Sequence, residues 1–124
     1  MGTFNRVHGK EIKDIGRLLG SDQYEKNYDF NDYEGPCYVE IGGACYVLDP
    51  SASAPGNGIA VFEEDDYDMD DVMKYSFKKF YKGVIGDTLD SVDQDADSAL
   101  HFNLSESAFS LRLNSDDRIG IETD

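Results

Sequence analysis

The sequence predicts an α+β fold: one domain over residues 1–124, with an antiparallel sheet of about six strands and one main amphipathic helix packed on it. Three observations support this prediction: short runs of alternating apolar and polar residues, a double-glycine turn, and one stretch with apolar residues at helical spacing. Hydrophobic residues make up 40% of the 124 residues, including 8 Tyr and 7 Phe. A chain of this length and composition has material for one core and little room for a second domain.

The clearest local signal is a β-hairpin. Two strand-like runs, 37–41 and 44–48, flank Gly42 and Gly43. Two glycines between such runs favour a tight hairpin turn, because glycine adopts the backbone angles that this turn requires. The sequence therefore predicts two adjacent antiparallel strands here.

The hairpin register also places the two cysteines. It pairs Cys37 with Leu48 and Cys45 with Glu40, so the two thiols lie on opposite faces of the hairpin. We therefore expect no disulfide between them, and we interpret both as small buried apolar residues.

Four further strands are expected. Residues 59–62 are apolar and follow a loop rich in proline and glycine, so they are expected to pair antiparallel to the second hairpin strand. Apolar and polar residues alternate at 100–104, 109–113 and 119–122. This pattern is typical of an antiparallel meander with one buried and one exposed face.

Two helices complete the expected fold. Residues 70–82 predict the main helix, because apolar residues recur there at spacings of three and four; they are Met69, Val72, Met73, Phe77, Phe80 and Val84. Acidic residues precede this stretch and lysines end it, as the helix dipole favours. A short N-terminal helix is expected over residues 10–19, with apolar residues on one face at Ile12, Ile15, Leu18 and Leu19.

The net charge is the most unusual property of the chain. Its 26 acidic residues against 11 Lys and Arg give a formal charge of −15, and the pI is near 4.2. Solubility requires much less charge, and self-repulsion on this scale destabilises a compact chain. We therefore expect a basic protein partner. We expect no direct nucleic-acid binding, because phosphate contacts require Lys and Arg.

The acidic residues gather in two stretches. Residues 63–71 hold seven acidic residues and Tyr67, whose ring would add contact area at an interface. Residues 87–97 hold five aspartates and no basic residue. The candidate partner-binding residues are Glu63, Glu64, Asp65, Asp66, Tyr67, Asp68, Asp70, Asp71, Asp87, Asp90, Asp93, Asp95 and Asp97.

No catalytic sequence motif occurs, so we expect a protein that is not an enzyme and uses no cofactor. The spacing of Asp93, Asp95 and Asp97 matches the first ligands of a calcium-binding hand loop. However, Ser98 stands where glycine is needed, and Leu104 stands where the bidentate glutamate is needed. We therefore assign no metal site.

The sequence gives no sign of a secreted protein or a membrane protein. The N-terminus has no apolar run of signal-peptide length, and no later run is long enough to span a bilayer. The two cysteines are too few for a disulfide framework. We expect a cytoplasmic protein without membrane contact.

Part of the chain carries a family resemblance. Within about residues 35–85, a hairpin, a strand and an acidic turn are followed by Tyr75-Ser76-Phe77-Lys78-Lys79-Phe80. This order, with its Ser-Phe-x-x-Phe pattern, resembles the SUKH superfamily. Many members of that superfamily are bacterial immunity proteins that neutralise toxins, often nucleases. The resemblance implies a strand followed by a helix at this place, and an immunity function.

Charge, composition and resemblance together predict an acidic immunity protein that binds a basic toxin, a nuclease, and occludes its active cleft. A phage-encoded nucleic-acid mimic that inhibits a CRISPR or restriction nuclease is the alternative, because it would use the same electrostatics. A calcium-binding or hydrolytic protein is the second alternative.

Overall fold

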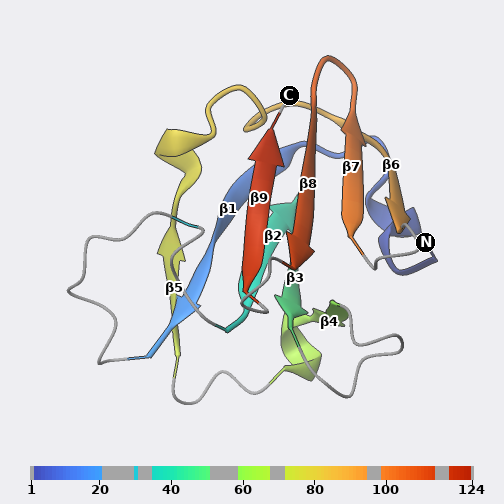
Figure 1. Cartoon of the computed structure of the whole chain (residues 1–124). Coiled ribbons are helices and arrows are strands. Elements are labelled where there is room, and N and C mark those ends of the chain that lie inside the picture. Colours follow the sequence, from blue (N-terminus) through green and yellow to red (C-terminus); the bar gives the residue numbers. More distant parts are fainter. Residues whose placement is uncertain are drawn as a thin grey trace.

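The protein is a sandwich of two antiparallel β-sheets (Figure 1). The computed structural model describes residues 2–20, 30, 35–50, 59–67, 72–94, 99–113 and 118–123. Within these ranges the chain forms nine strands, and the longest helix is the six-residue 3-10 helix η1 (Gly2–Val7). The predicted α+β fold with a main amphipathic helix is therefore wrong.

The first sheet has five strands in the order β4-β3-β2-β1-β5. Their bounds are β1 (Ile12–Leu19), β2 (Cys37–Ile41), β3 (Ala44–Asp49), β4 (Ala60–Glu63) and β5 (Met73–Ser76). The second sheet has four strands in the order β6-β7-β8-β9. Their bounds are β6 (Leu89–Gln94), β7 (Leu100–Leu104), β8 (Ala108–Leu113) and β9 (Ile119–Thr123).

The predicted hairpin, third strand and meander are confirmed. β2 pairs with β3 in the expected register, Cys37 with Leu48 and Glu40 with Cys45, and both cysteines are free thiols. β4 pairs antiparallel with β3, and β7, β8 and β9 form consecutive antiparallel pairs. Cys37 is buried as expected, whereas Cys45 is only partly buried.

The predicted helix over residues 10–19 is a β-strand, β1. Its register with β2 shifts between Ile12 and Asp14, and this bulge places Ile12 and Ile15 in the same core although they are three residues apart. Leu18 is buried on the opposite face of the sheet. A bulge combined with burial on both faces therefore produced the helical spacing.

The predicted helix over residues 70–82 is also wrong where the structure describes it. Residues 73–76 form β5, which pairs with β1 at one edge of the sheet, and a 3-10 helix, η5 (Lys78–Phe80), follows Phe77. Phe77 is only 2% exposed, but Met73 and Phe80 are 60% and 61% exposed. The apolar residues therefore do not share one buried face. Residues 70 and 71, where the helix was expected to begin, lie outside the described residues.

The second acidic stretch, residues 87–97, was not predicted to form a strand, but it contains β6. Leu89 and Val92 face the core, and the register between β6 and β7 shifts between Leu89 and Ser91. The bulge again places two inward residues three positions apart, so that strand alternation is hidden in the sequence.

The main core lies between the two sheets and contains residues from both. Phe4 of η1 is fully buried and contacts Tyr46 of β3 and Phe102 of β7, with ring centroids 4.7 and 5.4 Å away. The buried Arg17 of β1 donates a hydrogen bond of 2.6 Å to the carbonyl oxygen of Ile119 in β9. One residue from each of η1 and β1 therefore ties the two sheets together.

Candidate functional site: the acidic crossover

The acidic stretch of residues 63–71 is here called the acidic crossover, because it leads from one edge strand of the five-stranded sheet to the other. β4 and β5 are the outermost strands of this sheet, and four inter-strand spacings separate them, about 19 Å at the usual strand separation. Tyr67 and Val72 pack against Leu18, Tyr38 and Val47, a cluster separate from the main core. Tyr67 and Val72, the described residues on either side of positions 68–71, therefore lie on the outer face of this sheet.

Tyr67 anchors the first half of the crossover. Its hydroxyl group donates a hydrogen bond of 2.6 Å to a carboxylate oxygen of Asp49, and its ring lies 5.4 Å from that of Phe62. Between β4 and this anchor, a 3-10 helix, η4 (Glu64–Asp66), turns the chain. The partly buried side chain of Tyr67 thus holds the described part of the crossover against the sheet.

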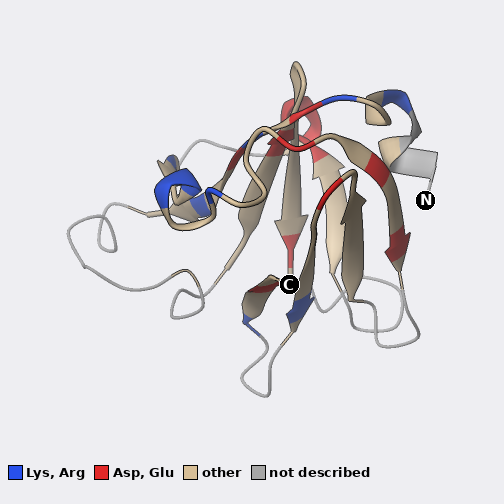
Figure 2. Cartoon of the chain, turned by 90° about the horizontal axis from the view of Figure 1, so that it is seen from above, with Lys and Arg blue, Asp and Glu red and all other residues tan. Residues whose placement is uncertain are grey.

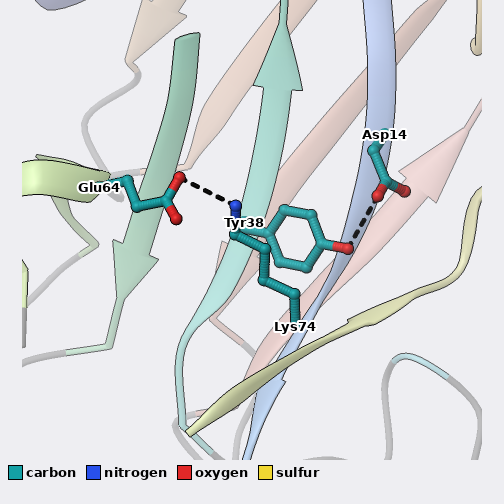
Figure 3. A network of polar contacts seen from close by, with 4 residues as sticks. All are labelled: Asp14, Tyr38, Glu64 and Lys74. Atoms are coloured by element: carbon teal, nitrogen blue, oxygen red, sulfur yellow. Dashed lines mark hydrogen bonds and ion pairs between the residues drawn. The ribbon is translucent and has the colours of Figure 1, made fainter. Parts of the chain in front are cut away.

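An ion pair joins the start of the crossover to the far edge of the sheet (Figure 3). The Nζ atom of Lys74 in β5 lies 2.9 Å from Oε2 of Glu64, and it lies 5.6 Å from the ring centroid of Tyr38, over which it passes. The Lys74 hydrogen bond is the main reason that the pKa of Glu64 is below its ordinary value. Burial, the largest single influence, lowers the pKa of Lys74, but the hydrogen bond with Glu64 and the surrounding charges raise it overall.

Beneath this ion pair, Tyr38 connects three strands. Its hydroxyl group donates a hydrogen bond of 2.9 Å to Asp14 of β1, and the hydroxyl group of Ser76 in β5 donates one of 2.6 Å to the other oxygen of Asp14. Burial, assisted by the Asp14 carboxylate, raises the pKa of Tyr38. The phenol therefore stays protonated and remains a hydrogen-bond donor.

A hollow of about 240 Å³ opens at the start of the crossover, lined by Arg6, Gly43, Ala44, Cys45, Glu63, Glu64 and Asp65. Burial is the main cause that raises the pKa of Cys45 to about 12. Because the thiolate is the nucleophilic form, this cysteine is poorly reactive at neutral pH. The hollow therefore has no activated thiol nucleophile.

The structure divides the predicted residues of the crossover into two kinds. Glu63 forms an ion pair with Arg6, and Glu64 forms the one with Lys74. Asp65 and Asp66 are exposed and form no ion pair with any described residue. The remaining predicted residues, Asp68, Asp70 and Asp71, lie outside the described residues.

The second predicted acidic stretch is partly used within the fold. Asp87 accepts a hydrogen bond of 2.7 Å from the Ser107 hydroxyl group, and this bond is the main cause that lowers the pKa of Asp87. Asp93 accepts one of 2.9 Å from Asn103, and Asp90 is exposed. Asp95 and Asp97 lie outside the described residues.

The described starts of the two acidic stretches belong to different sheets. β4, where the crossover begins, and β6 are edge strands of their respective sheets (Figure 1). The sequence alone identified both stretches as acidic. It did not find the residues that hold the crossover, Arg6, Asp14, Tyr38 and Lys74, because their partners are distant in sequence.

No protein-family model, no curated protein and no solved structure matches this chain. Among the described residues, no three His, Cys, Asp or Glu side chains are grouped as a metal ion would require. Within the same residues, no helix is long and apolar enough to cross a lipid bilayer.

Proposed function

We propose that this protein is a cytoplasmic immunity protein, which binds a basic toxin nuclease through the acidic crossover and occludes its active cleft. The observation that carries the proposal is the exposure of Asp65 and Asp66 on a segment whose neighbouring carboxylates are already paired internally. Glu63 and Glu64 are paired within the protein, whereas the next two charges are available to a partner.

Preorganisation is the physical advantage of this arrangement. A binding segment that is already ordered loses less conformational freedom on association, so more of its contact energy appears as affinity. The ion pair of Glu64 with Lys74 and the hydrogen bond of Tyr67 with Asp49 contribute to this order over residues 64–67. The formal charge of −15 adds long-range attraction, which raises the rate of encounter with a basic protein.

Affinity capture followed by an inhibition assay tests the proposal. The tagged protein is incubated with lysate of its native host at low salt, and bound proteins are eluted with rising salt and identified by mass spectrometry. We expect a basic nuclease among them, and we expect one equivalent of the purified protein to abolish its activity. A toxin gene next to the gene of this protein supports the proposal, whereas a phage operon and a host defence nuclease as target would favour the nucleic-acid mimic.

A variant with five neutralised aspartates connects the inhibition to the crossover. Changing Asp65, Asp66, Asp68, Asp70 and Asp71 to Asn is expected to weaken inhibition of the captured nuclease by about 10-fold or more, since several contacting charges are lost. The control changes exposed or partly exposed acidic residues elsewhere, Glu11, Glu40, Glu106 and Glu122, to Gln. Equal inhibition by both variants would show that the crossover is not the binding surface.

A further inference from the structure

Three lysines gather at one corner of the molecule. Residues 78–82, here called the lysine turn, contain Lys78, Lys79 and Lys82, and all three lysines are exposed. Figure 2 shows these basic residues on the coil at one side of the sandwich, while β6 carries acidic residues at the other side. Three of the seven lysines of a chain with a charge of −15 are thus concentrated in five residues.

The lysine turn also exposes an aromatic ring. Phe80 is 61% exposed, and Met73 is the other large apolar side chain that is exposed among the described residues. The Nζ atom of Lys79 lies 5.2 Å from the centroid of the Phe80 ring. An exposed ring among lysines combines apolar contact area with positive charge, and both are features of binding surfaces.

The turn is held rigidly at its base. Phe77 is buried, and its ring lies 5.6 Å from that of Phe30 and 5.8 Å from that of Phe80. The backbone N–H of Phe80 donates a hydrogen bond of 2.9 Å to the Phe77 carbonyl oxygen, and that of Tyr81 donates one of 3.1 Å to the Lys78 carbonyl oxygen. The exposed ring is therefore presented by a fixed backbone.

A small hollow lies beside the exposed ring. It has a volume of about 130 Å³ and is lined by Phe80, Tyr81, Gly83, Val84, Ser107 and Thr123. Its lining is more apolar than polar and includes Ser107 and Thr123. A hollow of this volume can accept one apolar side chain beside Phe80.

We propose that the lysine turn is a second interaction surface, which binds a short acidic peptide segment carrying one apolar anchor residue. Carboxylates of the segment pair with Lys78, Lys79 and Lys82, and the anchor enters the hollow beside Phe80. This surface is separate from the acidic crossover, so the inference does not depend on the proposed inhibitor function.

Charge screening favours a short segment over a nucleic acid or a membrane. At physiological salt, interactions of exposed charges are screened beyond about 8 Å, so a short segment on the turn is affected mainly by the nearby lysines. A nucleic-acid strand or an anionic bilayer extends well beyond the turn, over a molecule whose formal charge is −15. Such an extended polyanion is repelled by the net charge of −15.

Fluorescence anisotropy with a defined probe tests this inference. The probe is a fluorescein-labelled short peptide of alternating Asp and Glu with one central Leu. We expect it to bind the unmodified protein, and we expect the affinity to fall by about 10-fold when three charges are removed, since each adds to the local attraction. The variant carries Gln at Lys78, Lys79 and Lys82.

Two matched controls separate the turn from the general effect of charge and of exposed apolar area. The charge control places Gln at three exposed basic residues elsewhere, Lys10, Lys13 and Arg112, and is expected to change the affinity by less than about 2-fold. Phe80→Ser is expected to weaken binding, whereas Met73→Ser, which alters an equally exposed side chain, is not. Circular dichroism confirms that each variant remains folded.

Three results would overturn the inference. The first is that the unmodified protein does not bind the peptide. The second is an equal loss of affinity in the lysine-turn variant and its charge control. The third is binding of a labelled single-stranded oligothymidine or of phosphatidylglycerol vesicles without binding of the peptide, which would assign the surface to nucleic acid or to lipid.

Discussion

The ion pair of Glu64 with Lys74 is expected to stabilise the fold, and its contribution can be measured by a double-mutant cycle. The cycle uses Glu64→Gln, Lys74→Met and the double variant, so that only the pairwise energy remains. Both side chains are about one third exposed, 37% for Glu64 and 33% for Lys74, so solvent screens the pair. We therefore expect a coupling energy of about 0.5–1 kcal/mol at neutral pH.

The coupling energy should depend on pH with a defined sign. The pKa of Glu64 is lowered in the folded protein from its ordinary value of 4.5, so its stabilising effect is present above that value and disappears as the pH falls through the folded pKa. The pKa of Lys74 is raised from 10.5, so its effect is complete below that value and disappears as the pH rises through the folded pKa. The coupling is expected to be constant in the neutral range.

Urea unfolding of the four proteins at neutral pH and in acid measures this dependence. The exposed pair of Lys13 with Glu11, whose side chains are 52% and 54% exposed, serves as a control with a smaller expected coupling. A coupling energy near zero at neutral pH, or one that persists when Glu64 is protonated, would refute the role assigned to the pair.

Three further predictions concern stability and reactivity. Gly16→Ala is expected to lower the free energy of unfolding in urea by more than about 2 kcal/mol, because the added Cβ would lie 2.6 Å from the Tyr38 ring. Gly43→Ala is the control and should cost less, because a Cβ at Gly43 meets open space. Equal losses of stability in the two variants would contradict this prediction. Phe4→Ala is expected to cost about 3–5 kcal/mol in thermal unfolding, since the ring is buried between the sheets, and a loss below about 1 kcal/mol would contradict that packing. Iodoacetamide is expected to label Cys45 slowly at mildly alkaline pH, because its pKa is raised to about 12, and labelling at the rate of the urea-unfolded protein would disprove this.

The strands that could be predicted are those specified by local residues. The hairpin depends on Gly42 and Gly43 and on the runs beside them, and β7, β8 and β9 alternate without interruption. In each case the signal lies within a few residues, so no knowledge of distant partners is required.

The strands that were missed depend on the tertiary structure. Bulges place Ile12 with Ile15, and Leu89 with Val92, at a spacing of three, which imitates a helix in β1 and conceals the alternation in β6. β5 is an edge strand that is stabilised by pairing with β1, far away in the sequence. Local propensity could not reveal this pairing.

The negative charge of the candidate site could be predicted from the sequence, but the contacts that hold the site in place could not. Exposed Asp65 and Asp66 follow from composition, because clustered carboxylates remain at the surface unless they are paired. The polar network beneath the crossover depends on Tyr38 and Lys74, which contact residues on other strands. Such contacts follow from strand order, which the sequence does not display.

The rate of association with the captured nuclease tests the central claim most directly. Stopped-flow fluorescence at several salt concentrations compares the unmodified protein with Asp65→Asn/Asp66→Asn and with Glu106→Gln/Glu122→Gln, a control of equal charge change. If the acidic crossover is the binding surface, the rate constant falls by about 3-fold or more only in the first variant, and its salt dependence becomes weaker. Equal rate constants for the two variants at every salt concentration would contradict the claim.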